Sequence, residues 1–291
     1  MDIIDNNEQI KKQSLWKEVW RRLKRNKTAM FGLTVIILLI LMAIFADFIA
    51  PYHFDDQDLT RRFQFPNSSH WLGTDNFGRD VLSRIIYGSR ISLQVGLISV
   101  GIAATIGTVL GAIAAFYGGA LDNAVMRFMD ILLAIPGMLL AIAIASALGP
   151  GLRNMMIAIG IGAIPGYARV VRASVLTIKE QEFIEAAKSV GASNFKIITR
   201  HIMPNALAPL LVQATLGVAG AVLSAAALSF LGLGIQPPTP EWGAMLSAAR
   251  QFIRDYWHLA TFPGLMIMLV VYSLNVFGDG LRDALDPRLK D

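Results

Sequence analysis

The sequence contains no cysteine, which excludes disulfide bonds, catalysis by a thiol and metal sites built from cysteine. It never places a lysine directly after a glycine, so the phosphate-binding loop GxxxxGKS/T is absent as well. The four histidines are scattered, and none belongs to the HExxH pattern of zinc proteases. We therefore expect a chain that is not an enzyme, has no ATPase site of its own, and holds neither a metal nor a cofactor.

Charge is also scarce, since 16% of the residues are charged and 54% are hydrophobic, against about 25% charged residues in soluble domains. The mean hydropathy of +0.52 indicates contact with lipid. Several charge-free runs approach the roughly 20 residues that one membrane crossing requires. They predict an all-α integral membrane protein with six transmembrane helices, at residues 28–46, 91–121, 131–152, 154–168, 202–240 and 259–278. The fourth run is short, and the fifth is so long that it must include a loop near 232–240.

Positive charge is distributed unevenly around these runs. The chain has a net charge of +5, and 18 of its 26 lysines and arginines fall on one side of a six-span topology. Because cytoplasmic loops carry the excess of lysine and arginine, both termini are predicted in the cytoplasm. Lipid and not nucleic acid is then the partner of the basic residues. The first run is too long for a signal peptide and is expected to remain as an anchor.

These runs divide the chain into segments. Residues 50–90 end in a stretch whose apolar side chains share one helical face, which suits either a helix lying on the membrane or a helix packed on the transmembrane core. The expected segments are a cytoplasmic N-terminal segment at 1–28 with an interfacial helix near 15–24, a first transmembrane helix at 29–49, an extracytoplasmic loop with an interfacial helix at 50–90, a core of five transmembrane helices at 91–281 and a cytoplasmic tail at 282–291.

Small residues and prolines mark the spans. The second span carries small residues four apart, a spacing that lets another helix approach closely: Ala103, Gly107, Gly111, Ala115 and Gly119. We interpret this stripe as a packing device. The pairs Pro136-Gly137 and Pro165-Gly166 interrupt the third and fourth spans, and we interpret both as ordinary membrane prolines rather than breaks that line a pathway.

Acidic residues within spans would indicate ion-coupled transport. Four aspartates are placed by the sequence at the ends of spans: Asp47, Asp122, Asp130 and Asp279. This placement disfavours an ion-coupled secondary transporter, and no pair of acids or nucleophile–base set suggests an intramembrane enzyme. The pattern predicts a conduit whose energy comes from a partner.

The polar stretch between the fourth and fifth spans has the features of a docking element. A helix is predicted over 179–190, with Phe183 and Ala187 partly shielded and Gly191 at its C-terminus. Ser193 is a candidate N-cap for a second short helix over 194–200, which Pro204 should end before the fifth span. Two short helices at a bend would form a compact knob on the cytoplasmic face.

This stretch resembles the EAA loop of permease subunits of binding-protein-dependent ABC importers. It reads Glu185-Ala186-Ala187, then Gly191, then His-Ile-Met-Pro ending at Pro204, with methionine where leucine is more usual. Residues 73–84 and 88–93 resemble the segment before the second span in dipeptide, oligopeptide and nickel permeases. Residues 229–243 and 280–289 resemble the C-type subunit of that subgroup. The resemblance extends from about residue 15 to residue 290, which is nearly the whole chain.

The resemblance implies a type I ABC importer permease fold in the cytoplasmic (inner or plasma) membrane of a prokaryote. It also implies a heterodimeric pair of permeases that imports di- or oligopeptides, with nickel, glutathione or another small solute as the alternative. It implies four kinds of partner: a second homologous permease, two ATPase subunits that bind ATP and magnesium, an extracytoplasmic substrate-binding protein, and membrane lipid. ATP-driven closure of the ATPases would swing the permeases between inward- and outward-facing states. The sequence itself does not identify the solute or the residues that line its path.

The resemblance also assigns roles to residues. Within the coupling loop at 172–204, those expected to couple to the ATPase are Glu185, Ala186, Ala187, Gly191 and Pro204. The extracytoplasmic family motif comprises Asp75, Gly78, Arg79 and Asp80, which either contact the binding protein or brace the loop, and we favour bracing. Pro237, Pro238, Glu241 and Trp242 should lie in the outer loop before the last span. Trp242 and Trp257 are read as interfacial anchors.

Overall fold

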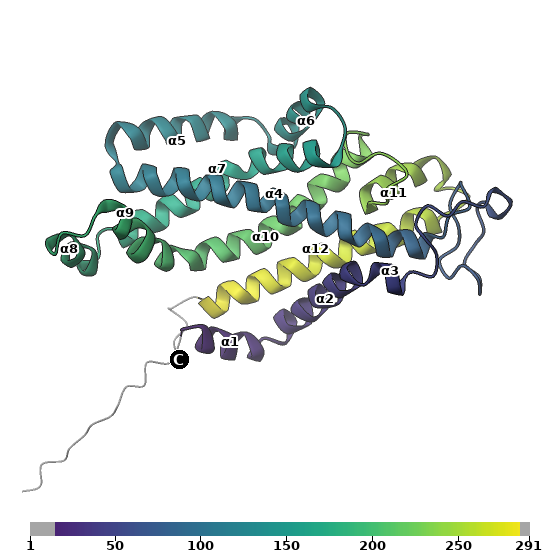
Figure 1. Ribbon diagram of the computed structural model, residues 1–291, viewed down its shortest axis with the longest axis horizontal. Helices are drawn as coiled ribbons and strands as arrows, with labels where there is room; N and C mark the ends of the chain where they lie inside the picture. Colours follow the sequence, from purple (N-terminus) through teal and green to yellow (C-terminus); the bar gives the residue numbers. More distant parts are fainter. Residues whose placement is uncertain (1–14, 286–291) are drawn as a thin grey trace, which may run out of the picture.

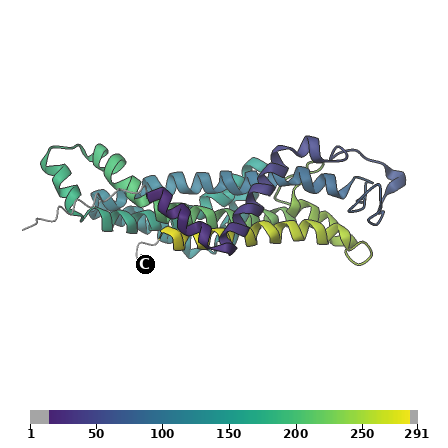
Figure 2. The ribbon, with the colours of Figure 1, turned by 90° about the horizontal axis from the view of Figure 1, so that it is seen from below.

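The computed structural model describes residues 15–285, so the first 14 residues and the end of the expected tail lie outside the described part. Within it the chain is helical and has no strand, only an isolated bridge between Thr74 and Asp80. The long helices run along one axis (Figure 1) and form a thin bundle when the view is turned by 90° (Figure 2). The α8 end and the long-loop end, which holds residues 51–80, lie at opposite ends of this axis (Figure 1).

The helices follow one another with short connections, apart from the long loop and the segment around 231–241. In chain order they are α1 Leu15–Arg25, α2 Lys27–Ile44, α3 Ala46–Ile49, η1 Leu59–Arg61, α4 Val81–Tyr117, α5 Gly119–Ala134, α6 Gly137–Leu148, α7 Leu152–Ile178, α8 Glu182–Ser189, α9 Asn194–Lys196, the π-helix η2 Ile197–Ile202, α10 Met203–Phe230, α11 Trp242–Ala249, η3 Arg250–Phe252 and α12 His258–Leu285. In the described part, five helices are long and apolar enough to cross a membrane, or six if the bent pair α5–α6 counts as one span. The predicted number of spans and the helix near 15–24 are confirmed.

The start of α4 differs from the prediction. The helix begins at Val81, ten residues before the expected second span, because the Asp80 side chain caps it by accepting a hydrogen bond from the Ser83 N–H. Ile85 and Ile86 are buried against the rest of the bundle. A separate interfacial helix at the end of 50–90 is therefore wrong, and the alternative of a helix packed on the core is right.

The stripe of small residues lets α4 and α7 pack closely. A Cβ atom on Gly107 would lie 2.6 Å from the Cβ of Tyr167, and one on Gly111 would collide with the backbone of Ala168. The packing interpretation is thus confirmed for the stripe as far as Ala115. Gly119 lies beyond α4, exposed at the start of α5.

The third span is sharply bent. Helices α5 and α6 meet at 90° across Ile135-Pro136, so interpreting Pro136-Gly137 as an ordinary membrane proline is wrong. Proline lacks the N–H that would continue the helical hydrogen bonds, and its ring clashes with the preceding turn. Pro165 instead lies inside the continuous helix α7, as expected. Because α5 starts at Gly119, Asp122 and Asp130 belong to this span and do not precede it.

The remaining spans are longer than their apolar runs. Helix α7 extends from Leu152 to Ile178 and carries two arginines on its second half, whereas the run predicted only 154–168. Helix α10 ends at Phe230, which confirms the loop expected near 232–240.

Pro204 does not end a short helix, because η2 continues into α10 and the N–H of Met203 donates to the Ile198 carbonyl. Pro204 occupies the first turn of α10, where a missing N–H costs little.

Candidate functional sites at the two ends of the bundle

Helix α8 projects beyond the other helices at its end of the bundle (Figures 1 and 2). Ile184 and Ala187 point back toward the bundle and are buried. They belong to a hydrophobic cluster that also contains Ala112 and Ala115 of α4, Val171 and Val175 of α7, and Ile197 and Ile202 of η2. This cluster packs α8 against the ends of the two long helices α4 and α7.

The turn after α8 has the geometry that its glycine requires. Gly191 has a φ of +79°, and its N–H donates to the Lys188 carbonyl over 2.9 Å. The N–H of Ala192 reaches the Ala187 carbonyl at 3.0 Å, which completes the closing hydrogen bonds of the helix. The Ser193 hydroxyl then accepts from the Lys196 N–H at the start of α9. The predicted C-terminus at Gly191 and N-cap at Ser193 are confirmed.

The outer surface of this knob comprises Glu185, Ala186, Val190 and Phe195, and we name it the coupling surface after the role predicted for Glu185 and Ala186. All four are exposed, with Val190 at 84% and Phe195 at 76%. Sequence reasoning missed Val190 and Phe195, although apolar residues flanking a predicted glycine turn were a usable signal. Exposed apolar side chains clustered around one turn indicate a surface that another protein covers.

Two residues of the predicted coupling set lie elsewhere. Ala187 is only 8% exposed and contacts the chain's own cluster, so it supports α8 from within rather than forming the outer contact expected of it. Pro204 is exposed on α10, below the knob. Phe183, expected to be shielded, is exposed at 44%.

At the long-loop end, the four predicted motif residues form one hydrogen-bonded turn. The Asp75 carboxylate accepts from the Arg79 guanidinium at 2.7 Å and from the N–H groups of Phe77 and Arg79. Gly78 has a φ of +74°, and its Cα lies against the Asp58 backbone, where no side chain would fit. Asp80 accepts from the Ser83 N–H and hydroxyl, and its other oxygen lies 2.9 Å from His70 Nδ1. These contacts are internal, as the bracing interpretation requires.

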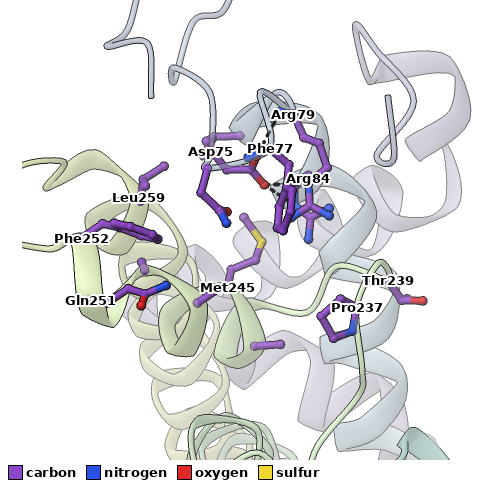
Figure 3. Close-up of a pocket in the computed structure, with 15 residues that line it drawn as sticks. Asp75, Phe77, Arg79, Arg84, Pro237, Thr239, Met245, Gln251, Phe252 and Leu259 are labelled. Carbon is purple, nitrogen blue, oxygen red and sulfur yellow. Dashed lines mark hydrogen bonds and ion pairs between the residues drawn. The ribbon is translucent and has the colours of Figure 1, made fainter. Parts of the chain in front are cut away.

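Arg84 connects this turn to a distant part of the chain. Its Nη1 donates to the carbonyls of Phe54 at 3.0 Å and Pro238 at 3.2 Å, and Asp75 lies 3.6 Å from its Nε. A cavity of about 130 Å³ lies beside it, between the motif turn and α11. Figure 3 shows Asp75, Arg79 and Arg84 on one side of this cavity and Phe252 on another. Sequence reasoning did not single out Arg84 or His70.

The start of α11 is fixed to α4 by buried residues. Glu241 accepts hydrogen bonds from the N–H groups of Gly243 and Ala244, both at 2.8 Å, and from the Ser92 hydroxyl. The indole N–H of Trp242 donates to the Ile85 carbonyl at 3.1 Å, and its side chain is fully buried. Reading Trp242 as an interfacial anchor is therefore wrong, because its ring fills the space that Gly88 leaves open. Trp257 is half exposed.

Electrostatic contacts also tie the loop end together. Asp47 of α3 accepts from Arg90 of α4 at 2.8 Å, and this hydrogen bond lowers the pKa of Asp47 below its ordinary value. Hydrogen bonds from the hydroxyl and N–H of Thr60 lower the pKa of Asp58.

Among residues 15–285, no group of three or more histidine, aspartate or glutamate side chains has the arrangement of a metal site.

Comparisons with known proteins agree with this geometry. The family described as the binding-protein-dependent transport system inner membrane component matches residues 107–291, and the N-terminal transmembrane domain of oligopeptide transport permease C matches residues 14–66. The dipeptide transport system permease protein DppC of Alkalihalophilus pseudofirmus is 52% identical over 277 residues, covering 95% of this chain and 91% of that protein. The glutathione transport system permease protein GsiD of Escherichia coli is 49% identical over 94% of this chain and 91% of its own length.

A solved structure shows the same fold. Inward-facing structures of the MetNI methionine ABC transporter match with TM-scores of 0.57 and 0.58 at 21% identity, over 70% of this chain and 96% or 97% of the other. Together with the helical bundle, this likeness confirms the type I ABC importer permease fold. The chain belongs to the family of binding-protein-dependent inner membrane transport components and is a multi-pass permease subunit of an ABC importer of the peptide and nickel type.

Proposed function

We propose that this subunit carries di- or oligopeptides across the cytoplasmic membrane, with energy supplied by separate ATPase subunits. The observation that carries the proposal is the coupling surface on α8 and α9, mounted on α4 and α7 by a buried cluster. The 52% identity to a dipeptide permease supports a peptide as the solute. Glutathione is the second candidate, because GsiD is almost as similar.

The proposed orientation places the α8 end and both termini in the cytoplasm and the long-loop end outside. The uneven distribution of lysine and arginine supports it. Helix α1 adds to the basic side, since its last turn carries Arg22, Lys24 and Arg25. In this orientation the coupling surface is available to the ATPases, and the braced loop is available to the substrate-binding protein.

In the proposed complex, this chain pairs with a second homologous permease, two ATPase subunits and an extracytoplasmic substrate-binding protein. ATP and magnesium are held by the ATPases, and this chain holds no cofactor and hydrolyses no nucleotide. Glu185 and Ala186 contact the ATPase together with Val190 and Phe195. Ala187 and Gly191 hold that surface in place, and Pro204 starts the helix that follows. Asp75, Gly78, Arg79 and Asp80 brace the loop that receives the binding protein.

Reconstitution into proteoliposomes tests this function. The complete complex should take up a labelled dipeptide only with ATP and loaded binding protein, and uptake should persist when the proton gradient is collapsed. Competition by unlabelled glutathione at equal concentration separates the two candidate solutes. Uptake driven by a proton gradient without ATP, or ATP hydrolysis by this chain alone, would contradict the proposal.

A further inference from the structure

Two oppositely charged residues lie inside helices that are candidate membrane spans. The Asp130 carboxylate of α5 lies 2.6 Å from the Arg169 guanidinium of α7, and both side chains are about half exposed, at 47% and 53%. Asp130 lies about 16 Å along the helix from the start of α5, and Arg169 lies about 14 Å from the end of α7. Exposed charges at such a depth are costly against lipid and usually face water or protein. This pair therefore indicates a surface that lipid does not cover.

A cavity of about 390 Å³ adjoins this ion pair. Leu133, three residues after Asp130, and Gly166, three residues before Arg169, both belong to its lining. Residues three apart are neighbours on a helix, so the pair lies at the rim of the cavity. The bend after α5 adds Gly137 to the same lining, and further glycines come from α7 and α10: Gly162, Gly217 and Gly220.

Two uncharged polar side chains of α10 also line this cavity. Gln213 and Ser224 are partly buried, and within residues 15–285 neither side chain has a hydrogen-bond partner. The nearby Tyr167 hydroxyl donates to the backbone carbonyl of Gln213 at 3.2 Å, so it leaves the Gln213 amide group free. Polar groups without partners are unfavourable in an apolar environment, so this space suits water or a polar solute better than lipid.

We propose that Asp130, Arg169, Gln213 and Ser224, which we name the polar track, line the path of the solute and bind a zwitterionic amide such as a short peptide. Asp130 receives the ammonium group, Arg169 receives the carboxylate, and Gln213 pairs with an amide. An exposed ion pair is weak, so either member can exchange its partner for the solute. The balanced charge favours a neutral zwitterion over a metal cation, which Arg169 would repel. This inference rests on the proposed peptide transport.

Labelling of single cysteines in the complete reconstituted complex tests the track, since the natural chain contains no cysteine. Ser224→Cys and Gly166→Cys place a thiol on the track, and a Cβ at residue 166 meets no atom closer than 3.8 Å. Leu97→Cys and Met268→Cys are controls at exposed apolar positions of α4 and α12. A charged, water-soluble thiol reagent should label the track cysteines at least tenfold faster, and dialanine with loaded binding protein should slow that labelling.

Equal labelling rates at track and control positions would mean that lipid or the second permease covers this surface, and would overturn the inference. Fast labelling that dialanine does not slow would overturn it too. A failure of the proposed function is distinguishable, because it appears as missing ATP-dependent uptake in the unlabelled complex.

A charge test gives an independent readout. Arg169→Gln should lower dialanine uptake at least tenfold without loss of the assembled complex, whereas Arg169→Lys, which keeps the positive charge, should restore most of it. Uptake at the natural level in Arg169→Gln would remove this arginine from the path.

Discussion

The N–H of Ala192 donates a hydrogen bond to the carbonyl of Ala187 across 3.0 Å, so the chain reverses sharply at the end of α8. This closure requires the left-handed conformation of Gly191, whose φ is +79°. A Cβ atom at Gly191 would meet nothing within 4 Å, so the demand on this residue concerns backbone conformation rather than space.

Gly191→Val should therefore misplace α9 and Phe195, because the left-handed conformation costs an ordinary L-residue about 1–2 kcal/mol and a β-branched one more. Gly191→Asn is the matched control, since asparagine tolerates this conformation. We expect the valine variant to insert normally and to lose most of the co-purified ATPase, while the asparagine variant keeps it. Equal recovery of ATPase with both variants would show that the turn does not position the coupling surface.

Ala187 and Ala186 are adjacent in α8, but Ala187 is buried and Ala186 is exposed. Ala187→Glu should destabilise the chain itself by about 3–5 kcal/mol, because it buries an unpaired carboxylate. Ala186→Glu should leave the thermal stability of the isolated chain within about 0.5 kcal/mol and weaken ATPase binding instead, because this residue is exposed. Thermal unfolding in detergent and ATPase co-purification distinguish the two effects. Similar melting temperatures for both variants would be inconsistent with the burial of Ala187.

The long-loop end depends on the buried carboxylate of Glu241. Glu241→Ala removes the acceptor for two backbone N–H groups and the Ser92 hydroxyl, and should cost about 1–3 kcal/mol. Ser68→Ala, in the exposed part of the loop, is the control and should leave the melting temperature unchanged. An Ala variant as stable as the natural chain would mean that α11 does not need this cap.

The orientation can be tested in intact cells with single cysteines and a reagent that does not cross the membrane. Ser68→Cys and Ala248→Cys, both exposed, should react, and Ser189→Cys at the end of α8 should not until the membrane is permeabilised. The positive-inside bias is the physical reason for this expectation. Labelling of Ser189→Cys from outside would invert the topology and remove the ATPase from the coupling surface.

The sequence predicts the span number, the α8 turn and the packing stripe because each depends on local rules: apolar length, a glycine after a helix, and small residues four apart. It does not distinguish Pro136 from Pro165, since each is followed by glycine. Pro165 is buried inside the continuous helix α7, which packs against α4, whereas Pro136 lies where α5 ends. The packing around each proline comes from residues distant in the sequence, so the local pattern does not show it.

The same limit explains the other errors. Ala186 and Ala187 are identical residues, and only the position of α4 and α7 shows which one is buried. Asp130 was assigned to a span end because its apolar run starts after it, although α5 begins at Gly119. The ring of Trp242 packs beside Gly88, which is 154 residues away in the chain. The sequence does not show that these two residues meet, so it predicts an interfacial anchor instead.

The central claim is that the coupling surface transmits ATP-driven movement to this permease. Val190→Ser combined with Phe195→Ser tests it most directly, since both side chains are exposed and their loss should not affect folding. In proteoliposomes containing the complete complex, we predict at least a tenfold loss of ATP-dependent dipeptide uptake, with the melting temperature of the isolated chain unchanged. Uptake at the natural rate by this double variant would contradict the account.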